Sequence, residues 1–356
     1  MGTDPVHDKT DAASASAASP KPLRNRQSAR PQRLILMGTG PFAVPAFEAI
    51  REAGHEIALV VTRPVVAVRS RKGPPPRPVR DFADRFGYPI FDPESINTPE
   101  SIAHLAQQRA SLLVVCDYGQ ILSPEALGVA PLGGINLHGS LLPAYRGAAP
   151  VQWAVINGDP VAGVSVIHMT PRLDGGPVLA IAEIPIAAND TSGSLEQKLS
   201  LLGVEPTLQS IEQLAQWDQR SPIGTPQDKS KVSRAPRLSK EAGRIDWSRS
   251  AKEIDCHIRG MQPWPGAFTE VALNEGRPPI RIAVRWATLV SPEPLAADGT
   301  QDVYEPGTLI DAQSLIIRAG SADAIRIERL QPAGRNEVSG VEFLRGYRLQ
   351  PGTRLG

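Results

Sequence analysis

The chain has 356 residues, of which 41% are hydrophobic and 21% charged, and a formal net charge of +1, the composition of an ordinary globular protein long enough for two domains. No apolar run approaches the ~18 residues that a membrane span requires, so we expect no membrane association. The two cysteines, Cys116 and Cys256, fit neither a disulfide framework nor a metal motif, so we expect a cytoplasmic protein without a bound metal.

Residues 1–32 are rich in Ala, Ser and Pro and lack apolar periodicity, which predicts a disordered tail. From Arg33 onward, buried-strand patterns alternate with amphipathic helical patterns. This alternation is typical of βαβ units and predicts a doubly wound, mostly parallel, Rossmann-like α/β sheet over residues 33–216. Its strands are expected at 33–38, 56–62, 111–116, 163–170 and 177–186, and its helices at 41–54, 79–87, 99–108 and, as one helix or a pair, 192–216.

The chain changes character after residue 216. Residues 217–239 are polar, with Pro, Gly, Ser and Lys, and we interpret them as an interdomain linker. In residues 240–356 one helix near 250–261 precedes several short strands, which predicts a small OB-like β-barrel domain. From Lys229 onward, 19 Lys and Arg stand against 15 Asp and Glu; this excess suits phosphate contact, although ordinary surface charge explains it equally well.

A glycine-rich pattern, G-x-G-x-x-A at Gly38, Gly40 and Ala43, follows the first predicted strand and precedes a helix. This is the context of a dinucleotide-binding turn, so an NADP-dependent oxidoreductase or a nucleotide-binding module is an alternative function. Pro41 removes one N–H that would hold pyrophosphate, whereas Arg63 could contact the 2′-phosphate of NADP. A tight strand-to-helix turn without any cofactor would show the same pattern.

Three polar residues form a candidate chemical centre. Asn136 and His138 lie two residues apart near the end of a predicted strand, so their side chains share one face. Asp174 lies in a glycine-flanked turn further on. Asn136 and a protonated His138 would stabilise an oxyanion as an amine attacks a carbonyl, and Asp174 would set the His charge and help to move the proton. Each residue alone is more commonly a turn or structural residue.

These residues lie within long stretches that resemble the methionyl-tRNA formyltransferases, a family of folate-dependent enzymes. The resemblance runs from about residue 33 to the C-terminus. It is carried by INLHGSLLPAYRGAAPVQWAVINGD (135–159), GVSVIHMTPRLDGGPVL (163–179), RLSKEAGRIDWSRSAKEIDCHIRGMQPWPGAF (237–268) and LQPAGRNEVSGVEFLRG (330–346).

The resemblance implies that Asn136, His138 and Asp174 are catalytic and that the formyl donor is 10-formyltetrahydrofolate. It also implies two sets of folate-binding residues. The pterin would lie against Tyr118, Ile121 and Leu122, and the adjacent folate loop would be Ser140, Leu141, Leu142 and Pro143. The stretch 118–122 could equally be plain core.

The acceptor implied by the resemblance is methionyl initiator tRNA, whose α-amino group would be formylated for translation initiation. Residues 240–356 and the basic loop at 63–78 would contact the tRNA, through Arg69, Arg71, Lys72 and also Arg146. The loop lacks the Asp and much of the Gly usual in the family, and a solvated basic loop is the alternative. We expect a monomer.

Two further points follow from the resemblance. Asp117 replaces a residue that is usually small and apolar in the family. A formyltransferase acting on a nucleotide amino sugar, or on another small amine, shares part of the motifs and is a second alternative function.

Overall fold

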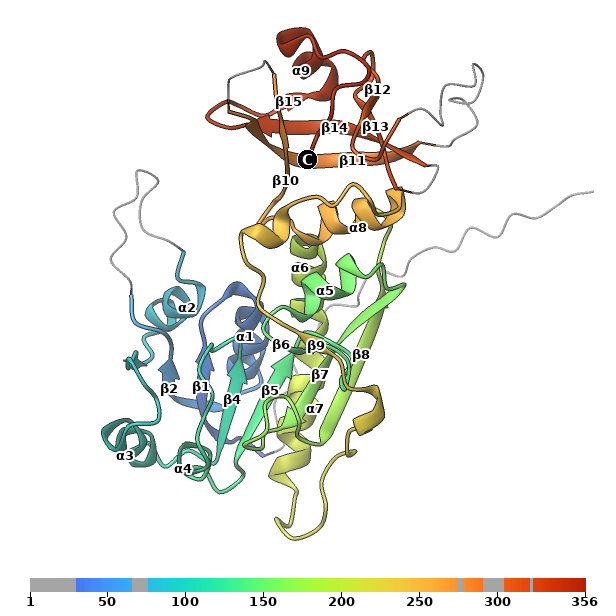
Figure 1. Cartoon of the computed structure of the whole chain (residues 1–356). Helices are drawn as coiled ribbons and strands as arrows, with labels where there is room; N and C mark the ends of the chain where they lie inside the picture. The colour runs from blue at the N-terminus through green and yellow to red at the C-terminus, as the bar shows by residue number, and fades with distance from the viewer. Residues whose placement is uncertain (1–29, 66–75, 274–277, 291–303, 321–322) are drawn as a thin grey trace, which may run out of the picture.

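The computed structural model describes residues 30–65, 76–273, 278–290, 304–320 and 323–356, and it has two parts joined by a single connection (Figure 1). Nearly all of the tail predicted at 1–32 lies outside these residues. Within the described part of the chain, no helix combines the length and the apolar character needed to cross a bilayer.

The first part is built on a seven-stranded sheet with the order β3-β2-β1-β4-β5-β7-β8. The first five strands of this order are parallel, whereas β7 runs antiparallel to β5 and β8 antiparallel to β7. The mostly parallel sheet predicted from the sequence is therefore confirmed. Its strands are β1 (Arg33–Gly38), β2 (Glu56–Val61), β3 (Ile90–Phe91), β4 (Leu112–Cys116), β5 (Gly134–His138), β7 (Val161–His168) and β8 (Val178–Pro185).

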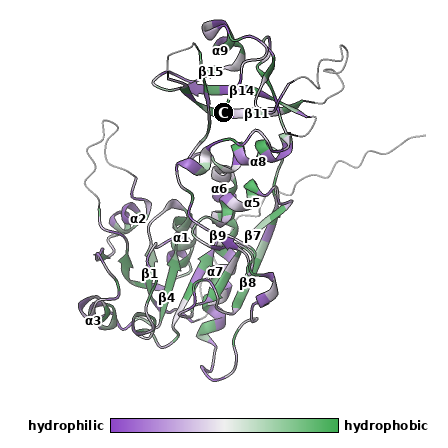
Figure 2. Cartoon of the chain, in the orientation of Figure 1, coloured by the Kyte–Doolittle hydropathy of each residue, from purple (hydrophilic) through white to green (hydrophobic). Residues whose placement is uncertain are grey.

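Helices cover both faces of this sheet, as a doubly wound fold requires. One core cluster joins the sheet to α1 (Val44–Glu52), α2 (Pro78–Phe86), α5 (Pro150–Ile156), α6 (Ser192–Leu202) and α7 (Val204–Ala215). A second cluster joins the opposite face to α3 (Pro99–Gln107) and α4 (Pro124–Leu127), and a 3-10 turn, η1 (Pro41–Ala43), precedes α1. Figure 2 shows the hydrophobic residues gathered along the strands between these layers.

The second part is an antiparallel β domain. Its sheet has the order β10-β11-β14-β13-β12, with β15 beside β14. The last residues of the chain connect the two edges, because Leu355 bridges to Val271 and Arg354 to Thr308. The elements are α8 (Ala251–Gly260), β10 (Ala267–Val271), β11 (Ile280–Val290), β12 (Leu309–Asp311), β13 (Ile316–Arg318), β14 (Ala324–Pro332), β15 (Val338–Ser339) and α9 (Gly340–Tyr347). The helix α9, which begins with a Ser339–Glu342 capping box, was not predicted.

The connecting segment (residues 217–239) runs back along the first sheet before it reaches the β domain. Thr225 exchanges two backbone hydrogen bonds with Val178. Further on, β9 (Arg234–Ala235) pairs in parallel with β6 (Arg146–Gly147). Two 3-10 turns, η2 (Lys229–Lys231) and η3 (Glu241–Gly243), flank β9. The segment interpreted as a linker is thus hydrogen-bonded to the first part of the molecule.

The two parts pack through α8, which lies against α5. Arg259 of α8 is 8% exposed. Its guanidinium donates to the Asp190 carbonyl (2.9 Å) ahead of α6 and to the Asp255 carboxylate (2.8 Å). A charge that is buried with its partner and hydrogen-bonded on both sides fixes how the helices meet.

We predict that Arg259→Met lowers the stability of the protein. The substitution leaves the Asp255 carboxylate and the Asp190 carbonyl without their donor, and breaking such a pair typically costs ~3–5 kcal/mol. Thermal unfolding should show a midpoint lower by roughly 5 °C or more. The control is Arg249→Met, because Arg249 forms a solvent-exposed pair with Asp246 worth at most about 1 kcal/mol. Equal midpoints for the two variants would contradict the prediction.

Candidate active site

Asn136 and His138 extend from the carboxyl half of β5. Ile135 and Leu137 belong to the core on the side of α1 and α6, so the two polar side chains point to the opposite face of the sheet. His138 is 6% exposed, and its Nε2 lies 2.9 Å from the Tyr145 carbonyl oxygen. Because a carbonyl only accepts, Nε2 must carry a hydrogen. Nδ1 is therefore the ring nitrogen left for other chemistry.

Asp174 meets both of these side chains. Its Oδ1 lies 3.4 Å from Asn136 Nδ2 and 3.8 Å from His138 Nδ1, and its Oδ2 accepts from the Gly147 N–H at 2.9 Å. The side chain is nearly buried, and the backbone has a left-handed φ of +48°. Such conformations are uncommon for residues other than glycine and cluster at functional sites. The three residues predicted to act together are brought together.

His138 Nδ1 and Asp174 Oδ1 face each other without a direct hydrogen bond. At 3.8 Å the two side chains are too far apart for a direct hydrogen bond. Since Nε2 is already protonated, Nδ1 can donate only when the ring is doubly protonated. An imidazole nitrogen and an amide donor thus border one carboxylate. With the ring doubly protonated, this arrangement can stabilise a developing oxyanion, and the carboxylate can accept a proton.

Tyr145 holds the histidine in place. Its φ is +60°, its N–H donates to Ser233 Oγ (2.8 Å), and its hydroxyl donates to Asp159 (2.8 Å) while accepting from Asn157 (2.9 Å). Burial, together with the Asp159 charge and against the Asn157 hydrogen bond, raises the pKa of Tyr145 to about 12. The tyrosine therefore stays neutral, and its carbonyl fixes the imidazole.

The loop predicted to contact folate follows β5 directly. Ser140 and Leu142 are buried, whereas Leu141 and Pro143 are partly exposed. Ser165 of β7 fixes the loop, because its Oγ donates to the Ser140 carbonyl and accepts from the Leu142 N–H. The loop is thus anchored to β7, the neighbour of the strand that carries His138, while Leu141 and Pro143 keep part of their surface exposed.

The three residues predicted as the pterin wall divide between the interior and the surface. Tyr118 and Leu122 are 2% and 3% exposed and belong to the core beneath α3 and α4. Ile121 is 62% exposed. Burial, partly offset by the charge of Arg63, raises the pKa of Tyr118 to about 12, and its hydroxyl has no hydrogen-bond partner in the structure. Of the three, Ile121 is the side chain open to a ligand.

The residues predicted to contact tRNA are placed only in part. Arg69, Arg71 and Lys72 lie outside the described residues. Arg146 lies in β6, beside the Asp174 turn, and its guanidinium donates to Gln227 Oε1 through Nε (3.1 Å) and Nη2 (2.6 Å). The sequence interpretation missed Gln227, and no signal marked it, since it is one polar residue in a polar segment.

The glycine-rich turn has a protein carboxylate at the place where a phosphate would bind. A Cβ at Gly40 would collide with Asp117 Oδ2, and the Gly40 N–H is hydrogen-bonded to that carboxylate. Burial raises the pKa of Asp117, against the Gly40 N–H and the charge of Arg237. The carboxylate of Asp117 therefore opposes a second anion at the Gly40 N–H.

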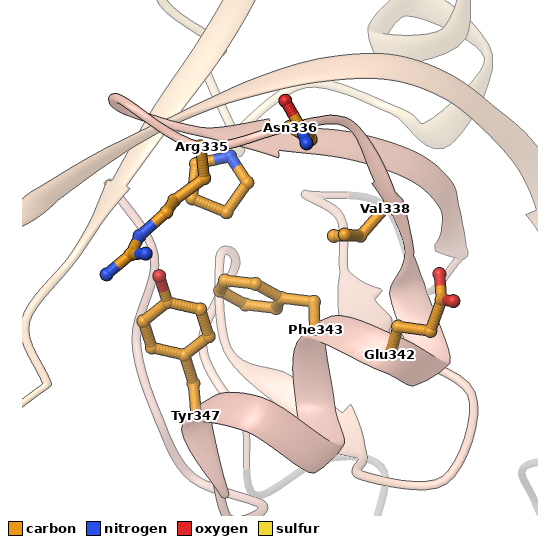
Figure 3. Close-up of a pocket in the computed structure, with 7 residues that line it drawn as sticks. Arg335, Asn336, Val338, Glu342, Phe343 and Tyr347 are labelled. Carbon is orange, nitrogen blue, oxygen red and sulfur yellow. The ribbon is translucent and has the colours of Figure 1, made fainter.

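A separate hollow of about 310 Å³ lies in the β domain, between α9 and the turn that joins β14 to β15 (Figure 3). The Phe343 and Tyr347 rings lie there with centroids 4.6 Å apart and their planes tilted by 36°. Glu342 is committed to the capping box of α9. The hollow is lined by Pro332, Arg335, Asn336, Val338, Glu342, Phe343 and Tyr347, and it contains no predicted site residue. No cluster able to hold a metal ion occurs in the described part of the chain.

Two family models match this chain. The model described as "Formyl transferase" matches residues 32–210, and "Formyl transferase, C-terminal domain" matches residues 237–348. The chain is 54% identical to the methionyl-tRNA formyltransferase of Rhodopirellula baltica over 340 residues, which covers 94% of this chain and 99% of the relative.

Two solved structures share the fold. HypX from Aquifex aeolicus, in complex with tetrahydrofolic acid, is similar with a TM-score of 0.57 at 16% identity, over 89% of this chain and 47% of that one. WlaRD, a sugar 3N-formyl transferase in the presence of dTDP and 5-N-formyl-THF, is similar with a TM-score of 0.58 at 16% identity, over 86% of this chain and all of that one.

We predict that NADPH does not bind to the glycine-rich turn. The carboxylate of Asp117 already accepts from the Gly40 N–H, so a pyrophosphate would face charge repulsion at that site. Titration with up to millimolar NADPH should leave the intrinsic fluorescence unchanged except for inner-filter absorption, whereas a folate should alter it. Saturable quenching by NADPH but not by a folate would contradict the prediction.

Proposed function

Because this chain belongs to the methionyl-tRNA formyltransferase family, we propose that it transfers the formyl group of 10-formyltetrahydrofolate to the α-amino group of methionyl initiator tRNA. The products are N-formylmethionyl-tRNA, used in translation initiation, and tetrahydrofolate. The observation that carries the proposal is the convergence of Asn136, His138 and Asp174, which is the residue set that amine attack on a formyl carbon needs. We further propose that the protein acts in the cytoplasm as a monomer.

Several exposed apolar side chains fit a flat, largely apolar donor. Leu173, next to Asp174, is 53% exposed, and Ile121, in the loop after β4, is 62% exposed; exposed large apolar side chains are typical of ligand sites. Leu141 and Pro143 add partly exposed apolar surface at the end of β5. We propose that these side chains hold the donor, with Tyr118 and Leu122 as the core that supports Ile121 and with Ser140 and Leu142 as the anchored part of the loop.

When bound, the donor supplies a formyl carbon attached to a folate nitrogen. Asn136 Nδ2 has two hydrogens, of which one is directed toward Asp174 and the second is available to the formyl oxygen. In the doubly protonated ring of His138, Nε2 donates to the Tyr145 carbonyl. Nδ1 then donates to the same formyl oxygen as Asn136. Both donors stabilise the negative charge that this oxygen gains as the uncharged α-amine attacks.

Asp174 moves the proton. Its Oδ2 is occupied by the Gly147 N–H, and its Oδ1 faces the space between Asn136 and His138. Oδ1 therefore accepts a proton from the attacking amine, directly or through water, and the proton is returned to the leaving nitrogen. In this scheme His138 donates a hydrogen bond from Nδ1 and acts as an electrophile, whereas Asp174 is the base.

The tRNA is proposed to be bound by the β domain and by basic residues of the catalytic half. Arg69, Arg71 and Lys72 would contact acceptor-stem phosphates, and such contacts carry affinity without reading sequence. Arg146 has Nη1 left after its two hydrogen bonds to Gln227. We propose that this remaining edge contacts the aminoacyl end of the tRNA beside Asp174.

The test is incubation of the purified protein with 10-formyltetrahydrofolate and charged initiator tRNA, followed by mass analysis of the released aminoacyl group. A gain of one formyl group is expected on methionyl-tRNA and not on an amino-sugar nucleotide. The KM for tRNA should rise steeply with salt concentration, because phosphate contacts release counterions. Efficient formylation of the amino-sugar nucleotide alone would refute the proposal.

We predict that His138→Ala and Asn136→Ala each lower kcat strongly. Loss of one oxyanion donor typically costs ~10²–10³ in rate. Single-turnover formylation of methionyl-tRNA should show this loss with little change in tRNA affinity. The matched control is Asn189→Ala, since Asn189 lies exposed in the turn before α6 and outside the proposed site. A loss below ~10-fold for His138→Ala would exclude the mechanism.

A further inference from the structure

Gln227 of the connecting segment reaches the catalytic turn from 53 residues away in sequence. Its Nε2 donates to the Asp174 carbonyl at 2.8 Å and to the Gly176 carbonyl at 2.7 Å. Its Oε1 accepts two hydrogen bonds from the Arg146 guanidinium, at 2.6 and 3.1 Å. A primary amide has two hydrogens and two acceptor lone pairs, so the side chain is fully hydrogen-bonded.

Only an amide of this length suits the position. On one side Gln227 meets a guanidinium, which can only donate, and on the other it meets two carbonyls, which can only accept. Glutamate would accept from Arg146 but would have no hydrogen to donate to the two carbonyls, so its second oxygen would repel them. Lysine or arginine would satisfy the carbonyls but would repel Arg146. Asparagine is one methylene shorter and cannot span both groups.

The turn of residues 174–176, which Gln227 contacts, has an unfavourable backbone conformation. Asp174 has a left-handed φ of +48°, a conformation disfavoured for residues with a side chain. Gly176 packs so closely that a Cβ there would collide with the His168 carbonyl. The backbone of residues 174–176 sets the direction of the Asp174 carboxylate, whose Oδ1 must stay near His138 Nδ1, now 3.8 Å away.

We propose that Gln227 is a positioning residue for catalysis, which holds the 174–176 turn so that the Asp174 carboxylate faces Asn136 and His138. It touches no reacting atom and acts only through the turn. The consequence for rate rests on the proposed function, whereas the positioning itself does not. A displacement of about 1 Å at a catalytic group costs on the order of 10²-fold in rate.

The experiment compares the full-length protein with three variants. Gln227→Ala removes all four hydrogen bonds, and Gln227→Glu keeps the acceptor for Arg146 but loses the donors to the turn. Gln209→Ala is the matched control, because Gln209 is exposed on α7 and bonds only to Glu205. The readouts are kcat and KM for methionyl-tRNA formylation, the unfolding midpoint, and the ¹⁵N chemical shifts of the His138 ring, which report its hydrogen-bonding without any turnover.

We expect both Gln227 variants to lose kcat by about 10- to 100-fold, with KM for the formyl donor changed less than about 3-fold. The His138 ring signals should shift in Gln227→Ala and stay unchanged in Gln209→Ala. Wild-type kcat and unshifted ring signals in Gln227→Glu would overturn the inference. The inference would also be overturned if the loss of kcat in Gln227→Ala were fully explained by a lower unfolding midpoint, with unshifted His138 ring signals. If the wild-type protein formylates nothing, the proposed function fails, and the ring signals still decide the positioning.

Discussion

The site depends on how one carboxylate is held. Asp174 has an unfavourable backbone conformation and little exposure, so it stays in place only because hydrogen bonds from separate parts of the chain fix it. The Gly147 N–H binds one carboxylate oxygen, Asn136 approaches the other, and Gln227 binds the backbone behind it. These donors hold both carboxylate oxygens and the backbone in place, and the imidazole of His138 lies beside the carboxylate.

The strand order of the first sheet explains why Asp174 is held by contacts from several loops. Since β7 is antiparallel to β5, its last residue His168 pairs with Ile135, at the start of β5 and not at the His138 end. The chain between β7 and β8 must therefore return along the face of β5 to bring Asp174 near His138. It cannot be held there by sheet hydrogen bonds, and the pairing of β6 with β9 and the contacts of the connecting segment supply the missing support.

The sequence predicted what local periodicity controls. The side chains of Asn136 and His138 lie on one face because strand side chains alternate, and the layered sheet follows from alternating strand and helix patterns. Tyr145, Gln227 and the position of Asp117 against Gly40 escaped prediction. Each depends on contacts between residues far apart in sequence that no short-range pattern encodes. Polar composition predicted a linker at 217–239, but composition cannot tell a free linker from a segment that is hydrogen-bonded to the protein at Thr225, Gln227 and β9.

The course of the connecting segment also bears on the two-domain organisation. The only covalent path from the first sheet to the β domain passes Gln227, then Ser233 beside Tyr145, and then β9 beside Gly147. The groups that orient His138 and Asp174, namely Tyr145, Gly147 and Gln227, therefore belong to this path or contact it. A displacement of the β domain that pulled on residues 225–235 would disturb the catalytic carboxylate and the imidazole together. The buried Arg259 contact between α8 and the residues before α6 opposes such a displacement, so the rigidity of the domain interface and the geometry of the site have the same structural origin.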